Sequence, residues 1–106
     1  QHYSPFCKLK ELKNADTDKL QNSTIIFYSP ESNIHQQLIS QKEILNFQAL
    51  YFTENNTETQ AASNLFSILR DLDAKGLSEV YFEWAPNHGL GLAINDRLKR
   101  AMAKRD

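Results

Sequence analysis

The hydrophobic residues of this chain fall into short runs that are separated by longer segments with helical spacing. The continuous apolar run 25–28 within segment 23–29 suits a strand that is buried on both faces, as in a parallel sheet. Segment 47–52 is expected to form a further strand. In segment 78–84, every second residue from Val80 onward is large and apolar. Segment 6–12 alternates more weakly and is expected to form a first strand or an edge strand. The pattern therefore predicts four strands.

The segments that follow the first two predicted strands carry weak helical signals. Segment 14–22 is polar and turn-like, so at most one short helix is expected there. Segment 31–44 is compatible with a helix, but its apolar stripe is thin. The stripe consists of Ile34, Leu38 and Ile39.

The two later helices are more clearly marked. Thr57 and Gln60 have the spacing of a capping box, and Gly76 is expected to end the same helix in a left-handed conformation. The buried face of this helix is predicted at Ala61, Leu65, Ile68, Leu69 and Leu72. A last helix is predicted over 92–103. Its inward side chains are expected to be Ile94, Leu98 and Ala101 or Met102.

Strands that alternate with helices at this spacing predict βαβ units and a parallel sheet. Right-handed crossovers then place helices on both faces of that sheet. The expected fold is α/β: a three-layer Rossmann-like domain with a small, mostly parallel sheet and helices on both faces.

The last strand and the last helix are joined by a sharp corner within 83–98. Pro86 cannot donate to a strand ladder, so it ends the strand. Gly89 and Gly91 allow the chain to turn and the helix to begin close to the strand. We expect Gly91 to be structural, either because a Cβ would clash or because its φ is positive. In α/β folds ligands collect at such strand ends.

Length and composition limit the possible functions. A chain of 106 residues with 41% hydrophobic and 24% charged residues is typical of one globular domain. No apolar run approaches the ~20 residues of a membrane helix, so no membrane role is expected. The lone Cys7 excludes an intrachain disulfide and fits a reducing, cytoplasmic location. Since the chain begins at Gln1, we interpret it as a piece of a longer protein.

Charge is unevenly spread along the chain. The net formal charge is -1, which argues against a dedicated nucleic-acid-binding domain. Residues 54–83 hold six acidic and two basic side chains, whereas residues 91–106 hold five basic and two acidic ones. We favour a solvated helix face for the basic end, because cations suit a helix C-terminus. An RNA or phosphate contact is the alternative.

Several kinds of chemistry are not supported by the residues. A dinucleotide fingerprint would need a small residue at position 94, which is Ile, and would follow the first strand. Cys7, His2, His35 and His88 have no zinc-ligand spacing. Neither a phospho-receiver acidic cluster nor a nucleophile–base constellation can be assembled. We expect no catalytic residue, metal or cofactor in this piece, although a helix N-terminus at the corner could still hold an anion.

Three ordered motifs carry a family resemblance. The run 89–101 (GLGLAINDRLKRA) resembles the closing signature of the C-terminal domain of two-domain threonylcarbamoyl-AMP synthases, the long relatives of the YrdC-like proteins that are often labelled translation factors. The run 2–5 (HYSP) is similar to that family's interdomain linker. The run 64–73 (NLFSILRDLD) is similar to its helix before the last strand.

The resemblance implies a division of the chain and a set of motif residues. Residues 1–5 would be a linker remnant and residues 6–106 a single C-terminal Rossmann-like accessory domain. The linker residues facing the catalytic pocket of the missing domain would be His2, Tyr3, Ser4 and Pro5. The family-motif corner would consist of Gly89, Gly91, Asn95, Asp96 and Arg97, in a structural or an interdomain role.

Helix geometry predicts the charge interactions of two residues in this corner. Asp96 lies near a helix N-terminus, where the dipole favours its charge. Arg97 is the next residue and cannot pair with Asp96 across a turn. We therefore expect Arg97 to reach a neighbouring strand end or another domain.

The resemblance also implies a function for the whole protein. The parent would be a nucleotidyltransferase that joins threonine, bicarbonate and ATP, with Mg, into threonylcarbamoyl-AMP and pyrophosphate, for tRNA threonylcarbamoylation. This piece would gate the pocket of its N-terminal catalytic domain, and other proteins of the pathway are further possible partners. The alternatives are a stand-alone nucleotide- or anion-binding module and a protein-interaction module.

Overall fold

The computed structural model describes residues 7–13 and 17–105 and contains one sheet of parallel strands. The described strands follow the spatial order β1-β4-β2-β3, and each of their pairings is parallel. Their bounds are β1 Lys8–Glu11, β2 Thr24–Phe27, β3 Gln48–Tyr51 and β4 Glu79–Phe82. The α/β class and the parallel sheet are confirmed, and β1 is an edge strand.

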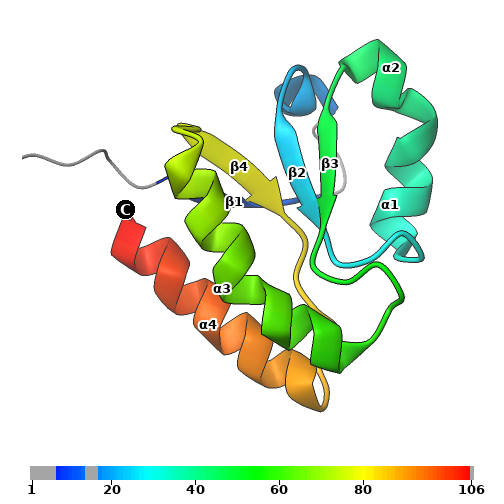
Figure 1. The fold of residues 1–106 in the computed structure, drawn as a ribbon. Helices are drawn as coiled ribbons and strands as arrows, with labels where there is room; N and C mark the ends of the chain where they lie inside the picture. The colour runs from blue at the N-terminus through cyan, green and yellow to red at the C-terminus, as the bar shows by residue number, and fades with distance from the viewer. Residues whose placement is uncertain (1–6, 14–16, 106) are drawn as a thin grey trace, which may run out of the picture.

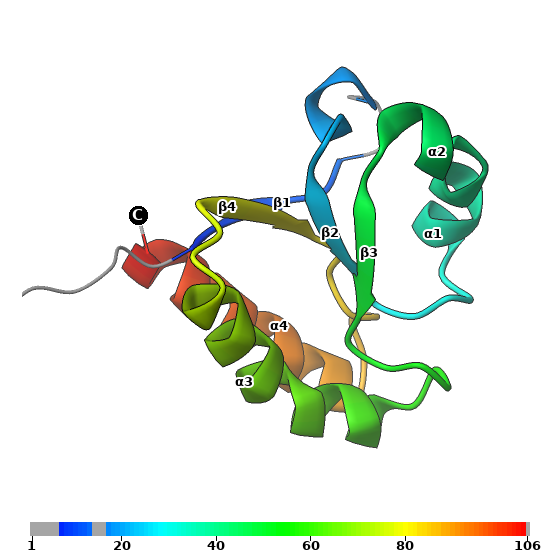
Figure 2. The same cartoon turned by 45° about the horizontal axis from the view of Figure 1, so that its top comes forward.

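Helices cover both faces of the sheet, as expected (Figures 1 and 2). The long helices α3 (Glu58–Ala74) and α4 (Leu90–Arg105) lie side by side on one face. The other face carries shorter elements. These are η1 (Thr17–Leu20), α1 (Asn33–Leu38), η2 (Ile39–Gln41) and α2 (Lys42–Leu45).

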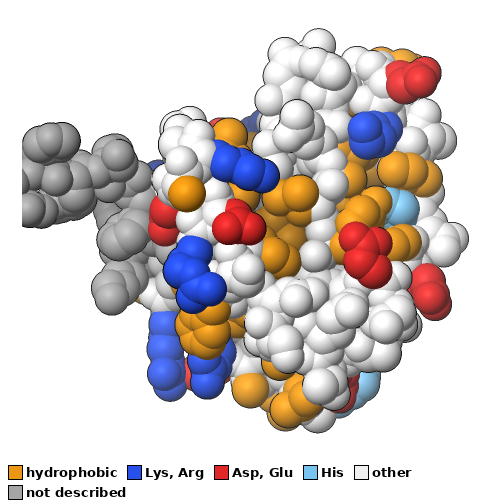
Figure 3. Space-filling model, in the orientation of Figure 1, with side chains coloured by type: hydrophobic (Ala, Val, Ile, Leu, Met, Phe, Trp, Pro, Cys, Tyr) orange, Lys and Arg blue, Asp and Glu red, His pale blue; other side chains and the backbone are white. Residues whose placement is uncertain are grey.

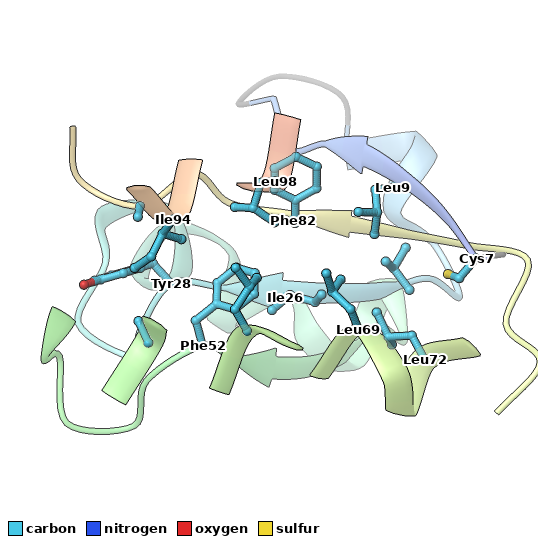
Figure 4. Close-up of a cluster of buried hydrophobic side chains, with 14 residues drawn as sticks. Cys7, Leu9, Ile26, Tyr28, Phe52, Leu69, Leu72, Phe82, Ile94 and Leu98 are labelled. Carbon is cyan, nitrogen blue, oxygen red and sulfur yellow. The ribbon is translucent and has the colours of Figure 1, made fainter. Parts of the chain in front are cut away.

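Each face of the sheet has its own hydrophobic cluster. The central strand β2 and the residue after it supply both clusters: Ile26 and Tyr28 pack under α3 and α4, whereas Ile25 and Phe27 face α1 and α2. Successive side chains of a strand point to opposite faces, so a continuous apolar run fills two cores at once. Figure 4 shows the first cluster, in which β-strand side chains meet those of the two long helices. The continuous run in the sequence is thereby explained.

The helix expected over 31–44 is interrupted. It consists of α1, one turn of η2 and α2, and Ile39, assigned to the buried stripe, is 39% exposed. Asn46 ends α2 with a φ of 57°. Asparagine tolerates this left-handed conformation, which lets the chain reverse directly into β3. The thin apolar stripe therefore indicated three short turns instead of one helix.

The capping box predicted at the start of α3 is wrong. Thr57 makes no side-chain cap hydrogen bond, although it does occupy the N-cap position. The Gln60 side-chain oxygen instead accepts from the Thr53 hydroxyl at 2.8 Å and from the Glu54 N–H at 2.8 Å. The oxygen of the buried Thr53 hydroxyl accepts from the Thr57 N–H at 3.1 Å, so the backbone donor of the expected capping box already has a partner.

The other features of the long helices agree with the sequence. Gly76 follows α3 with a φ of 72°, and the predicted buried residues of α3 and α4 contact the core. α4 begins at Leu90, two residues before the predicted start, which places Gly91 inside its first turn. Within the described part of the chain, no helix combines the length and the apolar character needed to cross a membrane.

Candidate functional site

The adjacent strands β2 and β4 send their connections to opposite faces of the sheet. The chain leaving β2 enters α1 on one face, whereas the chain leaving β4 enters α4 on the other (Figure 1). A crevice opens between the carboxyl ends of strands that diverge in this way, and open α/β sheets bind ligands there. The residues just after β2 and β4 therefore define the candidate site.

Glu83 closes the ladder at the point where the two strands part. Its backbone N–H donates to the Ile26 carbonyl at 2.8 Å, as a continuing strand would. Its side-chain Oε1 then accepts from the Tyr28 N–H at 2.8 Å. The carboxylate thus takes the place of the next backbone carbonyl and holds the two strand ends together.

An open pocket of about 560 Å³ lies over this carboxylate. Its polar lining consists of Tyr28, Glu31, Ser32, Asn33, Gln37, Asn56 and Glu83. Ile34 and Pro86 supply apolar wall. Of the described residues that line it, none is Lys or Arg, so the pocket offers hydrogen-bonding groups and negative charge without a cation.

The environment of Glu83 disfavours its charge. Burial raises the pKa of Glu83 above its ordinary value of 4.5. The Tyr28 N–H, the Ser32 hydroxyl and the neighbouring His35 oppose this rise without cancelling it. The folded protein therefore binds a proton at Glu83 more readily than the unfolded chain does.

Glu83→Gln is expected to stabilise the domain relative to the native chain, and increasingly so as the pH rises. The raised pKa contributes stability below about 4.5, and this contribution is lost as the pH rises through the folded-state value. Glutamine carries no charge to desolvate and still offers an oxygen to the Tyr28 N–H. Urea unfolding at about pH 5 and about pH 8 measures the difference. Glu43→Gln, on the exposed surface of α2, is the control, and an equal effect of Glu83→Gln at both pH values would contradict the prediction.

The family-motif corner is held by Asn95, which is only 7% exposed. Its Oδ1 accepts from the Ala85 N–H at 2.8 Å, and its Nδ2 donates to the Ala85 carbonyl at 2.9 Å. One amide side chain thus satisfies both backbone groups of a buried loop residue. This contact fastens the loop after β4 to the second turn of α4.

The two glycines of the corner have different reasons to lack a side chain. Gly89 has a φ of 55°, and a Cβ there would lie 2.9 Å from the Glu58 carboxylate. Gly91 is outside the left-handed region, but a Cβ would overlap the Pro86 carbonyl oxygen and lie 3.0 Å from its carbon. Of the two causes expected for Gly91, the clash applies, and the obstacle is the preceding loop instead of the sheet.

Asp96 and Arg97 point away from the corner. Asp96 pairs with Arg100 one turn later at 2.8 Å, on an exposed part of α4. The Arg97 guanidinium lies 4.9 Å from the centre of the Phe66 ring on α3. Its partner is therefore an aromatic ring of the neighbouring helix and not a strand end.

His88 is expected to matter little for stability. Its Nδ1 lies 3.3 Å from Glu58 Oε2, but its side chain is 77% exposed. Exposed pairs of this kind contribute little. His88→Ala should therefore change the free energy of unfolding by less than ~0.5 kcal/mol, as measured by thermal melts. A loss of more than ~1 kcal/mol would show that the Glu58 contact fastens the corner.

The linker residues predicted from the sequence cannot be placed relative to this site. His2, Tyr3, Ser4 and Pro5 lie outside the described residues. Among the described residues, no group of three or more His, Cys, Asp or Glu side chains could hold a metal ion.

The sequence pattern does not single out Glu83, which lines the pocket, or the nearby His35. Glu83 contributes to the sequence pattern as one of the acidic residues of 54–83, and its place directly after an apolar strand is the signal that could identify it. His35 lies in the segment with the weak helical signal, yet it is buried, and its Nε2 lies 2.8 Å from the Tyr51 hydroxyl. No local sequence pattern predicts the contact between His35 and Tyr51, because the packing of α1 on β3 brings these two residues together.

Comparison with known proteins gives a consistent result. Residues 1–103 match the family described as threonylcarbamoyl-AMP synthase, C-terminal domain. The chain is also similar to P. abyssi Sua5, solved in complex with L-threonine, with a TM-score of 0.55 and 22% identity. This likeness covers 99% of the chain but 31% of Sua5, so the chain spans about a third of that protein. No curated protein matches. Because the family match extends over nearly the whole length, the chain belongs to the threonylcarbamoyl-AMP synthase C-terminal domain family.

Proposed function

We propose that this chain is the accessory domain of a threonylcarbamoyl-AMP synthase, and that it gates the pocket of an N-terminal catalytic domain. The observation that carries the proposal is the family match over residues 1–103, which includes the linker motif at 2–5. The parent enzyme converts threonine, bicarbonate and ATP into threonylcarbamoyl-AMP and pyrophosphate. ATP and Mg are bound by the catalytic domain, and the linker folds over its pocket.

A surface suited to a partner domain is present on the two long helices. An apolar groove between α3 and α4 is lined in part by Phe66, Leu90 and Arg97. Phe66 is 50% exposed and Leu90 is 44% exposed. Figure 3 shows hydrophobic side chains next to Lys and Arg side chains over these helices. Exposed aromatic residues next to arginine are typical of interfaces, which supports an interdomain role for Arg97.

The division of labour can be tested by comparing two proteins. The 106-residue chain alone should release no pyrophosphate from ATP in the presence of threonine and bicarbonate. The same chain joined to its catalytic domain should do so. Synthesis of threonylcarbamoyl-AMP by the separate chain would overturn the accessory role.

The α3–α4 groove gives a sharper test in the joined protein. Phe66→Glu is expected to lower the rate of pyrophosphate release roughly tenfold, or about 1.4 kcal/mol, because it replaces an exposed aromatic side chain by a carboxylate that must be desolvated at the interface. Ile44→Glu is the matched control, since Ile44 is 79% exposed on α2, on the other side of the sheet. Melting curves check that both variants fold. Equal activity of the two variants would place the contact elsewhere.

The alternative of a stand-alone anion-binding module has less support. The pocket at the strand ends has an acidic carboxylate and no cation among its described lining residues. Phosphate groups are favoured by Arg, Lys or free N–H groups. A protein-interaction module remains compatible with the α3–α4 groove, and in the joined protein it would coincide with the accessory role.

A further inference from the structure

The pocket over Glu83 has unused hydrogen-bonding capacity at the position where open α/β sheets bind ligands. Its volume of about 560 Å³ is within the range of small-molecule sites. The crevice arises because β2 and β4 send their chains to opposite faces. Neither the accessory role nor the family match assigns a ligand to it.

The half-buried carboxylate of Glu83 still has acceptor sites to offer. A carboxylate has about four lone-pair sites. The Tyr28 N–H occupies one at 2.8 Å. The Ser32 hydroxyl is near enough to favour the charged carboxylate and so to lower the pKa of Glu83. The remaining sites can accept from two hydroxyl groups of one ligand.

Amide side chains complete the polar lining. Asn33 and Gln37 are one turn apart on α1 and expose their side chains on the same face of the helix. Asn56 accepts from the Ser29 hydroxyl at 3.0 Å through Oδ1, so its amide N–H₂ is available. Amides both donate and accept, which matches hydroxyl groups, since each hydroxyl also does both.

The chemistry of the lining excludes one class of ligand and favours another. With carboxylates at Glu31 and Glu83 and no Lys or Arg among its described lining residues, the pocket repels a phosphate. Ile34 and Pro86 offer apolar surface for the C–H face of a ring. We propose that this pocket binds a small ligand through a vicinal diol, in which two neighbouring hydroxyls donate to Glu83.

A vicinal diol occurs both in the ribose of a nucleoside and in a free sugar, and the probes distinguish the two. Amide chemical shifts of the 106-residue chain are followed during titration with adenosine, 2′,3′-dideoxyadenosine, ribose and inorganic phosphate. Adenosine should shift the signals of Tyr28, Ser32 and Glu83 saturably. Dideoxyadenosine should bind at least about tenfold more weakly, since two hydrogen bonds to a charged group are lost. Equal saturation by ribose identifies a free sugar as the source, and saturation by adenosine alone identifies a nucleoside.

Substitutions in the pocket test whether its lining residues bind adenosine. Glu83→Gln keeps the acceptor for Tyr28 and should weaken adenosine binding about tenfold, because the charged acceptor is lost. Gln37→Ala should weaken it severalfold with an unchanged melting temperature. Gln36→Ala is the matched control, because Gln36 is exposed on the same helix but does not line the pocket.

Four results would overturn the proposal. They are equal binding of adenosine and its dideoxy analogue, displacement of adenosine by phosphate, equal effects of the Gln36 and Gln37 variants, and no saturable shift with any probe. The proposal does not depend on the accessory role, since these titrations need no catalytic domain. A failed titration therefore leaves the pyrophosphate assay unaffected, and a failed assay leaves the titration unaffected.

Discussion

Gly91→Val is expected to lower the free energy of unfolding by about 3 kcal/mol, the upper end of what overpacking usually costs. The new Cβ would overlap the Pro86 carbonyl oxygen, and the backbone of a loop cannot rotate away as a flexible side chain can. Gly91 lies in the first turn of α4, where helix propensity alone would favour replacement. A lower free energy of unfolding therefore indicates the steric clash, whereas a higher one would indicate that helix propensity dominates.

Thermal melts measure this effect directly. At this chain length, each kcal/mol corresponds to roughly 4–8 °C in Tm, so a fall of more than about 10 °C is expected. Gly76→Ala is the control: its φ of 72° strains any side chain, but nothing lies within 4 Å of the added Cβ. That variant should lose only ~1 kcal/mol. An unchanged Tm for Gly91→Val, together with damaged activity in the joined enzyme, would mean that the glycine serves a ligand or the other domain.

Asn95→Ala is expected to destabilise the domain by about 2–4 kcal/mol. The substitution removes the partner of both the N–H and the carbonyl of Ala85, which is 5% exposed. A buried backbone group without a partner costs about 1–3 kcal/mol. The loop after β4 would then lose its attachment to α4, and its amide hydrogens should exchange faster with solvent.

Two further variants show whether the amide itself is responsible. Asn95→Asp keeps the shape but cannot donate to the Ala85 carbonyl from a charged carboxylate, so it should also be destabilised. Asn87→Ala, at an exposed position in the same loop, should change stability by less than ~0.5 kcal/mol. Equal melting temperatures for Asn95→Ala and Asn87→Ala would show that the Ala85 groups find other partners.

The candidate site is a mixture of predictable and unpredictable parts. The corner could be located because Pro86, Gly89 and Gly91 have local conformational meanings that hold in any fold. The contact between Asn95 and Ala85 could not, since an asparagine in a helix has many possible partners until the loop is placed beside it. Whether the corner also serves an interdomain contact stays a prediction.

By itself, the sequence determined the strands, the two long helices and the buried faces of these helices. Local periodicity is a property of neighbouring residues, so the run Ile25 to Tyr28 identifies a two-sided strand and the spacing of Leu65, Leu69 and Leu72 identifies one face of a helix. The βα alternation then determined the class, and the ordered motifs determined the family. These features need no knowledge of which strands are neighbours.

Only the tertiary structure decided how the strands are ordered and what that order creates. Placing β4 beside β2 is a long-range pairing, which depends on how both faces of the sheet are covered and not on any local pattern. That neighbourhood brings Glu83 to the Tyr28 N–H and opens the pocket between the diverging strands. The pairing of the Thr53 N–H with the Tyr28 carbonyl likewise places the Thr53 hydroxyl next to the start of α3. There this hydroxyl accepts from the Thr57 N–H and bonds to Gln60, and these contacts replace the local capping box.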